Sequence, residues 1–529
     1  MIKRYWADVV YALLAAAILA WVRWDAFQFR LITYSPGADY WEHTAVLRAL
    51  LDDPWHPAHP LIATDAASPR FGPHFLLVAL LGRLLHYDAV DAMALSAVMN
   101  TLLLLAALWW FLRGYFRDSR AALYGLVVFF CSWGAAPHFS NVFKLKVFFS
   151  VAGYPSTAAL AMTLVGLGLV VRLLRSERRS RLGLALSALI WAYVYVTHPL
   201  TATMALPAAV LLALTEPGVA RRERFWVAGS VCAGFLLSAA WPYYPALGMV
   251  FGGTVHRVRG LEPESFAPPH EFYEPHHLAD ILGYCFASFF MLPYLWVRRQ
   301  DVFAVLGALL MLAVFVASAL LPIPLGHRYV LLSVFFLQFA LVRLLLNFTP
   351  YAGAPGTWAS RPWLRIPAWV AVFALLAYMT VTNVAVAREH FEHTAGSTRA
   401  KESVTLRCAR RVGELAGPHA IVLSTALASW SLPTFGPKIV PPYHKNPLIV
   451  DADERRRAAL RFFAFGTSDA ERDAIVAAYH VTHVLVPARN AAAVSRFVGD
   501  DQLLARLPGG SELYALPVAA LPVAAPPVR

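Results

Sequence analysis

Charge and cysteine are both scarce in this chain. Only 15% of its 529 residues are Asp, Glu, Lys or Arg, whereas 59% are hydrophobic. A typical soluble domain has about 25% charged and about 45–50% apolar residues, so the composition excludes a wholly soluble protein. Of the four cysteines, Cys131, Cys232 and Cys285 lie within apolar blocks and Cys408 stands alone nearer the C-terminus. Neither a disulfide framework nor a thiolate metal site is therefore expected.

Phosphate-binding motifs are also missing where a nucleotide fold would be expected. The segment after residue 388 contains neither Gly-x-Gly-x-x-Gly nor a P-loop, so a nucleotide site is not predicted there. The net charge of +13 comes from short basic clusters between apolar blocks rather than from one basic stripe with interleaved aromatic residues. This pattern excludes a nucleic-acid partner and indicates membrane orientation instead.

Apolar blocks long enough to cross a bilayer recur up to about residue 387. A spanning helix needs about 20 residues. The first block is not followed by a small-residue cleavage site, which predicts an uncleaved first helix rather than a signal peptide. The blocks predict about eleven spans, near 7–22, 89–112, 121–139, 152–171, 182–197, 200–214, 225–249, 278–297, 302–321, 329–346 and 367–387.

Basic residues concentrate in alternate loops, which sets the expected orientation. The positive-inside rule places the N-terminus in the cytoplasm, because Arg-rich loops such as 113–120, 172–181 and 221–224 then all face inward. The apolar stretch 75–85 must then lie along the membrane surface or re-enter it. With an odd number of spans, the segment after residue 387 lies on the opposite, outer side.

The sequence thus predicts a mainly α, polytopic transmembrane helical bundle with a C-terminal extracytoplasmic α/β domain. Residues 1–387 form the membrane module, including a long first outside loop at about 23–88. Residues 388–516 form the α/β domain, and 517–529 form a flexible tail rich in Pro, Ala and Val. Within the domain we expect strands at 420–424, 481–486 and 512–516, and helices at 453–463 and 469–479.

Asp39 and Glu42 are the first candidates for chemistry. They precede apolar residues repeating at helical spacing, so a helix is expected there with both carboxylates on one face. Carboxylates close to lipid are costly unless they are paired, solvated or used. A pair of acids serves as a general base or holds a divalent cation. The alternative is a structural role, in which Asp39 caps the helix and Glu42 completes the capping arrangement.

A second group of candidates lies at other outer loop ends. Arg328, between His327 and Tyr329, presents a planar fork suited to phosphate oxygens; the alternative is an interfacial anchor. Lys144 and Lys146 break the positive-inside pattern and are candidates for binding a lipid phosphate, although lysines near headgroups are common. His198 sits in a tight turn between two spans, where a structural hydrogen bond competes with substrate binding.

Histidines elsewhere offer weaker candidates. His56 and His59 are three residues apart, but the neighbouring prolines favour an extended segment over a helical metal site. The outside loop at about 250–277 is either a solvated loop or the source of a metal ligand, through Glu262, Glu264, His270, Glu271, Glu274, His276 and His277. The loop 441–447 is polar and proline-restricted, and is either a plain loop or a contact for substrate.

Together these features resemble the GT-C superfamily of membrane glycosyltransferases. The shared features are the acidic motif Asp39–His43 (DYWEH) in a long first outside loop, surface helices, the Arg328–Tyr329 step and a C-terminal outside α/β domain. The superfamily includes protein O-mannosyltransferases, the aminoarabinose transferase of lipid A and oligosaccharyltransferases. This chain departs from the adjacent acidic pair of the mannosyltransferases, because Tyr40 follows Asp39. It also lacks the Trp-Trp-Asp signature of oligosaccharyltransferases.

The resemblance implies transfer of a sugar from a polyprenyl-phosphate-linked donor to a glycan, lipid or protein acceptor on the periplasmic face of a bacterial inner membrane. It implies a catalytic role for Asp39 and phosphate binding by Arg328. Glu42 is a further catalytic candidate, and the further candidates for binding lipid phosphate or substrate are His327, Lys144, Lys146, His43 and His198. Whether Asp39 and Glu42 hold a divalent cation, Mg²⁺ or Mn²⁺, is left open. The competing interpretations are a polysaccharide or lipid transporter, which would typically show internal repeats, and a noncatalytic membrane scaffold.

Overall fold

The computed structural model describes residues 2–28, 39–134, 139–176, 180–251, 270–321, 323, 325–349, 362–400, 404–444 and 448–517. The chain divides into two compact units. Unit 1 comprises residues 1–31, 72–74 and 94–394, and unit 2 comprises 32–71, 75–93 and 395–529. Most of the first outside loop therefore belongs to the same compact unit as the C-terminal segment. The acidic residues Glu262 and Glu264 and the tail 518–529 lie outside the described residues.

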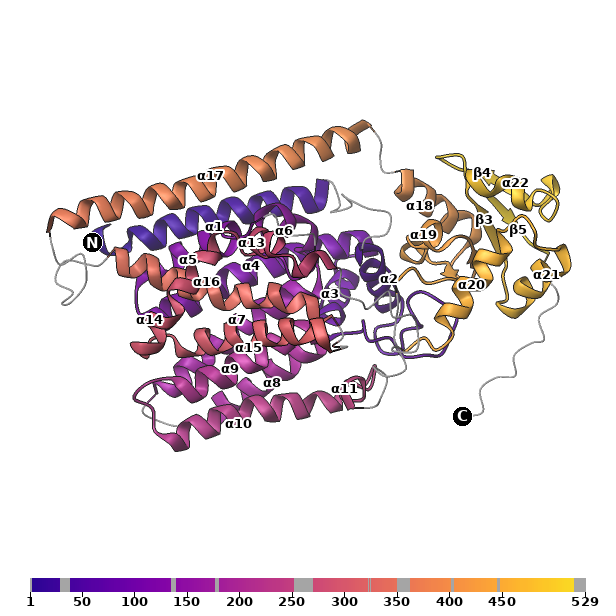
Figure 1. The fold of residues 1–529 in the computed structure, drawn as a ribbon. Coiled ribbons are helices and arrows are strands. Elements are labelled where there is room, and N and C mark those ends of the chain that lie inside the picture. The colour runs from indigo at the N-terminus through magenta and orange to yellow at the C-terminus, as the bar shows by residue number, and fades with distance from the viewer. Residues whose placement is uncertain are drawn as a thin grey trace. The chain divides into compact units, whose positions relative to one another are not determined.

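Unit 1 is a bundle of helices, most of which begin close to the starts of the predicted spans (Figure 1). Its α-helices are α1 (Ile2–Gln28), α4 (Ala89–Phe116), α5 (Ser119–Cys131), α6 (Leu145–Val151), α7 (Pro155–Leu174), α8 (Arg181–Thr197), α9 (Pro199–Thr215), α10 (Arg221–Leu237), α11 (Gly248–Phe251), α13 (Pro275–Leu282), α14 (Leu292–Val297), α15 (Val302–Leu320), α16 (Tyr329–Phe348) and α17 (Pro362–Ala400). Of these, α4 belongs to unit 1 from Ala94 onward and α17 as far as Thr394. Short 3₁₀ turns are η1 (Ser238–Ala240), η3 (His270–Tyr273), η4 (Gly283–Phe290) and η5 (Gly326–Arg328).

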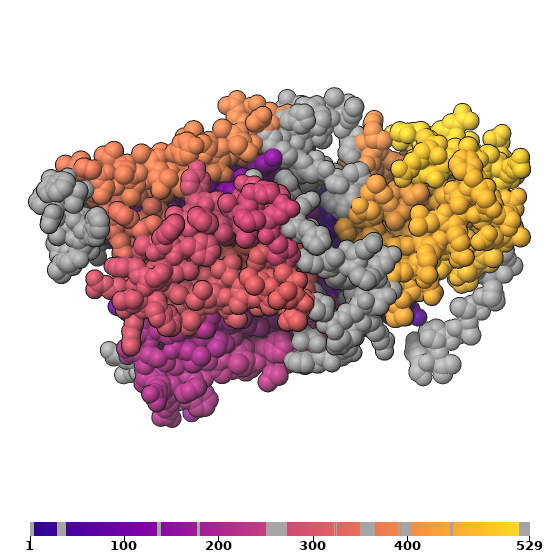
Figure 2. Space-filling view, viewed as in Figure 1, coloured from indigo at the N-terminus to yellow at the C-terminus, as the bar shows by residue number. Residues whose placement is uncertain are grey.

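Hydropathy and exposure together indicate a multi-pass membrane protein. Six of the described helices are long and apolar enough to cross a bilayer, within Tyr5–Gln28, Ala89–Phe116, Pro155–Leu174, Val302–Leu320, Gly326–Phe348 and Ile366–Glu389. Large apolar side chains are exposed along α14 and α15, including Val297, Val316 and Leu320, and Figure 2 shows this segment (salmon) on the viewed face. Such a surface is stable against lipid tails rather than water. Several shorter apolar helices accompany the six, so the number of eleven spans stays a prediction.

Helices α1 and α17 lie side by side in unit 1 (Figure 1), where the Trp6 and Phe373 rings are 5.8 Å apart. The Asn383 side chain of α17 also donates a hydrogen bond of 3.2 Å to the Cys131 carbonyl at the end of α5. Helix α17 continues to Ala400, beyond the predicted end of the last span at 387. The apolar run ends near 387, but helical backbone geometry does not need an apolar sequence to continue.

The predicted span at 278–297 was wrong as a single helix. The segment is divided into α13, η4 and α14. Gly283 has φ +50°, and its missing side chain leaves room for the backbone of 132–134, since a Cβ there would lie 2.3 Å from the Gly134 nitrogen. The Tyr284 N–H donates to the Ser132 carbonyl at 2.9 Å. A loop backbone thus takes over hydrogen bonds that a continuous helix would have made internally.

Two further predicted spans extended past the ends of their helices. Helix α5 ends at Cys131, not 139, and α10 ends at Leu237, not 249. After α10 the chain forms η1 and then meets Pro242 and Pro245. Proline cannot donate a backbone hydrogen bond, so the apolar character continues there while the helix does not.

Unit 2 combines helices of the first loop with a small mixed sheet. From the first loop come α2 (Asp39–Asp52) and α3 (Pro73–Leu84), of which α3 belongs to unit 2 from Phe75 onward. The prediction of a helix after Asp39 is confirmed, and α3, of 12 residues, is too short to span a bilayer. The C-terminal part contains α18 (Val404–Ala416), α19 (Ala426–Ser429), η7 (Leu432–Phe435), α20 (Ala452–Phe462), α21 (Asp469–Ala478), η8 (Ala488–Asn490), α22 (Ala491–Val494) and η9 (Asp500–Gln502).

The sheet of unit 2 has the order β2-β1-β3-β5-β4. Strand β1 pairs in parallel with β2 and β3, whereas β5 pairs antiparallel with β3 and β4. The predicted strands at 420–424, 481–486 and 512–516 and both predicted helices are present. The strands are β1 (Ile421–Leu423), β2 (Lys438–Ile439), β3 (His483–Val486), β4 (Leu503–Arg506) and β5 (Glu512–Ala515).

The core of this sheet and one contact at its edge hold unit 2 together. Val484 and Phe462 are fully buried, and Val486 almost so, in a cluster between the sheet and helices α20 and α21. At β2, the Ile439 N–H donates to the Leu61 carbonyl at 2.9 Å. The first loop therefore supplies a backbone partner to the edge strand, which would otherwise expose unpaired polar groups.

Candidate functional site

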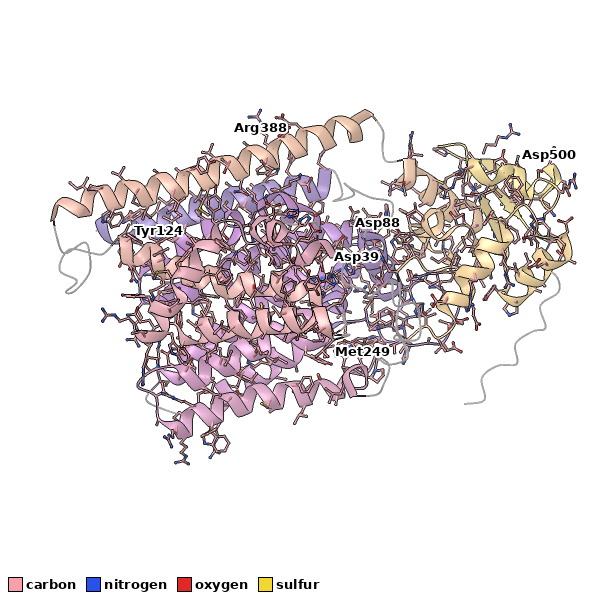
Figure 3. All side chains as sticks on the ribbon, in the orientation of Figure 1. Asp39, Asp88, Tyr124, Met249, Arg388 and Asp500 are labelled. Carbon is pink, nitrogen blue, oxygen red and sulfur yellow. The ribbon has the colours of Figure 1, made fainter. Side chains whose placement is uncertain are left out.

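The first turn of α2 presents two acids in different environments (Figure 3 labels Asp39). The helix forms because Val46, Leu47 and Leu50 recur at helical spacing and are fully buried. The Asp39 side chain is 42% exposed, whereas the Glu42 side chain is 3% exposed. Both lie at the helix N-terminus, where the backbone dipole favours negative charge. Of the two, Asp39 is the one accessible enough to meet a substrate.

Asp39 contacts a histidine from the C-terminal segment of unit 2. His444 Nε2 lies 3.1 Å from Asp39 Oδ1. The His444 ring stands perpendicular to the fully buried Trp430 ring, with centroids 5.0 Å apart, and also contacts Tyr443. The loop 441–447, for which the sequence allowed either a plain loop or a substrate contact, therefore reaches the acidic motif through His444; its residues 445–447 lie outside the described residues.

Glu42 contacts Arg70, with Arg70 Nη2 2.8 Å from Glu42 Oε2. The contact is a close ion pair without hydrogen-bond alignment. The Arg70 side chain is one-third exposed and the Glu42 side chain is buried. The buried carboxylate therefore holds a guanidinium that reaches the surface. A buried charge is tolerated only when its partner is close.

The pairing of Glu42 does not fit a divalent cation shared with Asp39. A metal ion bound by both acids would have to displace the Arg70 guanidinium, which already neutralises Glu42. Within the described part of the chain, the one group of three or more ligand-type side chains close together is Glu274, His276 and His277, whose ligand atoms lie within 4.8 Å of one another. In this structure Glu42 is therefore assigned to Arg70, and the side chain that contacts Asp39 from the C-terminal segment is His444.

His43 and His59 are both buried in unit 2. The His43 ring packs against Phe75, with centroids 5.4 Å apart. His59 Nδ1 accepts hydrogen bonds from the backbone N–H groups of Leu61 and Ile62, both at 3.2 Å. Burial, with the nearby charges of Lys438 and Arg455, lowers the pKa of His59 to about 3. His59 therefore braces its own loop and does not share a metal with His56, which is exposed.

Arg328 and His327 lie in unit 1, in the short turn η5 before α16. The Arg328 guanidinium carbon lies 4.5 Å above the centroid of the Phe139 ring, and the His327 ring lies 5.0 Å from Phe272. Gly326 allows the turn to press against α15, because a Cβ there would lie 2.1 Å from the Ser318 Cβ. Stacking on an aromatic ring orients the planar guanidinium without using its N–H donors.

His198 of unit 1 is the N-cap of α9. Its Nδ1 accepts from the Thr201 N–H at 3.1 Å and lies 2.8 Å from Thr201 Oγ1. Asn141 Nδ2 donates to the same hydroxyl at 3.2 Å. Because Nδ1 is an acceptor, the neutral ring carries its proton on Nε2. The structural hydrogen bond that the sequence allowed for His198 is therefore present. The same tautomer makes Nε2 the N–H donor of the ring.

Lys144 and Lys146 flank the start of α6 in unit 1. Lys144 Nζ donates to the Gly134 carbonyl at 2.6 Å. Partial burial, with a smaller contribution from the charge of Lys146, lowers the pKa of Lys144. Lys144 thus braces the loop after α5, while Lys146 is partly exposed on α6 itself.

Three residues at these positions were not singled out from the sequence: Arg70, Asn141 and His444. The signal for His444 was its place in the proline-restricted loop. Arg70 and Asn141 carried no motif, because their partners lie 28 and 60 positions away.

Neither a family model nor a curated protein matches this chain by sequence. Among solved structures, it is similar to ArnT from Cupriavidus metallidurans in the apo state, with a TM-score of 0.52 and 14% identity over 96% of this chain and 98% of that one. It is similarly close to the same protein bound to undecaprenyl phosphate, with a TM-score of 0.53 and 14% identity over 97% and 98%. It also resembles the Archaeoglobus fulgidus oligosaccharyltransferase tethered to an acceptor peptide, with a TM-score of 0.55 and 12% identity over 92% of this chain and 70% of that one.

These likenesses extend over almost the whole chain, including both compact units. At identities of 14% and below they concern the fold rather than the chemistry. They agree with the bundle, the helical first loop and the C-terminal α/β segment that the sequence predicted. The chain has the fold of these ArnT and oligosaccharyltransferase structures.

Proposed function

We propose that this protein is an integral membrane glycosyltransferase that moves a sugar from a polyprenyl-phosphate-linked donor to an acceptor on the periplasmic face of a bacterial inner membrane. The observation that carries the proposal is Asp39, an accessible carboxylate held by His444 at the start of α2 on a GT-C fold. The acceptor is a glycan, a lipid or a protein. Two of the similar structures contain undecaprenyl phosphate or dolichol-phosphate, which supports a donor of this class.

Asp39 is the proposed general base. Its carboxylate takes the proton of the acceptor hydroxyl as that oxygen attacks the anomeric carbon. The bond between the anomeric carbon and the donor phosphate oxygen breaks, and the electron pair leaves with the phosphate. A single direct displacement of this kind inverts the anomeric configuration. General-base catalysis contributes about 10²–10⁴-fold to such a step.

Arg328 is the proposed ligand of the lipid phosphate. The leaving phosphate gains negative charge as the glycosidic bond breaks, so a fixed cation stabilises the transition state more than the ground state. The Phe139 ring holds the guanidinium plane in place before the donor arrives. His198 Nε2 and Lys146 are proposed as further donors to the phosphate or sugar. His327 lies in the same turn as Arg328, η5, where its ring packs against Phe272.

Glu42 and Arg70 receive a supporting role in this proposal. Because the Glu42 carboxylate is buried against Arg70, we assign it to holding that guanidinium rather than to proton transfer. Arg70 then presents a positive charge beside Glu42, which lies one helical turn after the proposed base. The reaction uses no divalent cation at Glu42, since Arg70 already balances its charge.

The test compares cell-envelope glycans and polyprenyl-phosphate sugars, by mass spectrometry, in cells with the native protein, with Asp39→Asn or without the protein. The native protein should consume a lipid-linked sugar that accumulates in both other strains, and one envelope glycan should lose a residue in them. The Asn variant should insert in the membrane at native levels and stay folded, with only a small shift of its melting temperature, because the Asp39 side chain is 42% exposed. Full transfer by the Asn variant would rule out Asp39 as the base. Unchanged lipid-linked sugars in all three strains would refute the glycosyltransferase and favour a transporter or scaffold.

A further inference from the structure

The loop that carries His444 is built to hold an imidazole in one place. Pro441 and Pro442 restrict the backbone just before it. The fully buried Trp430 ring and the Tyr443 ring both pack against the His444 ring, with centroids 5.0 and 4.9 Å away. Trp430 and Tyr443 also contact each other at 5.8 Å. Such aromatic packing is unnecessary for a solvated loop, and it leaves Nε2 directed at Asp39 Oδ1.

Asp39, the partner of His444, lies in the first turn of α2, and a helix is least constrained at its ends. Asp39 is the first residue of α2, and first turns fray because their backbone N–H groups have no partners within the helix. The rest of α2 is anchored by buried Trp41 and by a hydrogen bond of 2.7 Å between the Thr44 and Thr434 hydroxyls. The orientation of the Asp39 side chain therefore depends on what contacts the carboxylate itself.

We propose that His444 is a positioning residue for the Asp39 carboxylate, so that the segment 395–529 completes the base of the transferase; this rests on the proposed function. His444 Nε2–H donates to Asp39 Oδ1 before and during the reaction and never touches substrate. Asp39 Oδ2 takes the acceptor proton while the acceptor oxygen bonds to the anomeric carbon and the phosphate leaves with its electron pair. The C-terminal segment then contributes to the rate and not to sugar binding.

The experiment separates this role from simple packing with three variants. His444→Gln keeps an N–H donor at a similar distance from the backbone, whereas His444→Phe keeps a ring but has no donor. Thr434→Val is the matched control, because it removes another contact between the same segment and α2 without touching Asp39. Each purified protein is assayed in detergent with the polyprenyl-phosphate sugar and the unmodified envelope acceptor, both extracted from cells that lack the protein.

The expected result for His444→Phe is a loss of about 30- to 100-fold in kcat with KM unchanged within about twofold, since a base misplaced by about 1 Å costs about 10²-fold. His444→Gln should stay within about fivefold of the native kcat. Thr434→Val should lower the melting temperature but keep the native kcat. Equal losses of kcat in the Gln and Phe variants, a loss confined to KM, or a native kcat in the Phe variant would each overturn the proposal.

A measurement that needs no turnover keeps the two proposals distinguishable. Melting temperatures of the native protein, Asp39→Asn, His444→Phe and the double variant form a cycle, which reports the coupling of the two side chains. If the native protein transfers no sugar, the proposed function fails, and the cycle still decides the contact. Additive shifts would overturn the Asp39–His444 pairing, and non-additive shifts would support it.

Discussion

The Glu42–Arg70 pair should respond unequally to removal of its two members. Arg70→Ala leaves the Glu42 carboxylate, only 3% exposed, without its cation. Removing one partner of a buried ion pair costs about 3–5 kcal/mol, because the remaining charge stays desolvated. Glu42→Gln instead leaves the Arg70 guanidinium, which is 33% exposed and so remains within reach of water. The cost of that change should be about 1–2 kcal/mol, close to that of a lost polar contact.

The double variant makes the prediction sharper. When Glu42 is already Gln, Arg70→Ala no longer strands a charge, so its further cost should fall to the loss of a side chain at the surface. The double variant should therefore be more stable than Arg70→Ala alone. A surface substitution costs about 0.5 kcal/mol or less, so the coupling between the two sites should be about 2.5–4.5 kcal/mol.

Fluorescence-detected thermal unfolding in one detergent is a suitable assay, because it ranks the four proteins without assuming a two-state transition. The expected order of melting temperature is native, then Glu42→Gln, then the double variant, with Arg70→Ala lowest. If Glu42→Gln melts as low as Arg70→Ala, or the two losses simply add, the buried carboxylate is not what Arg70 stabilises and the supporting role assigned to the pair is refuted.

Gly283→Ala should destabilise the protein by about 2–4 kcal/mol, because φ is +50° and a Cβ would lie 2.3 Å from the Gly134 nitrogen. The control is Gly229→Ala in α10, where a Cβ would meet open space, so this change should be neutral or slightly stabilising. Equal melting temperatures for the two variants would refute the argument. The lowered pKa of His59, about 3 against about 6.5 when unfolded, means that the folded state favours the neutral ring, so its stabilisation is complete above pH 6.5 and is lost as pH falls toward 3. At pH 5 the loss of stability should be about 2 kcal/mol. His59→Asn keeps an acceptor for the N–H groups of Leu61 and Ile62 but does not titrate, so its melting temperature should fall less between pH 7 and pH 5 than that of the native protein. Parallel falls in the two melting temperatures would contradict the argument.

Patterns of hydropathy and helical spacing were enough to predict most of the architecture. Long apolar blocks specify membrane helices because the bilayer accepts little else. Short apolar runs predicted three of the five strands, and helical spacing of apolar residues predicted the helix at Asp39. Of the missed strands, β2 has only two residues, and β4 is half-buried or exposed at every position, whereas β1, β3 and β5 each contain a buried run. The break at Gly283 was also invisible, because the segment is as apolar as a continuous span and the feature that breaks it, the backbone of 132–134, comes from elsewhere in the chain.

What the sequence alone determined is the class of protein and the chemical identity of its few polar groups. The scarcity of charged residues identifies a membrane protein, and the sequence shows which residues of the first outside loop are acids, whatever the fold. Only the tertiary structure decided which acid is accessible and what holds it, since Asp39 meets His444 405 positions later and Glu42 is buried against Arg70. Contacts of such long sequence separation arise from packing of the whole unit, and no local pattern of residues encodes them.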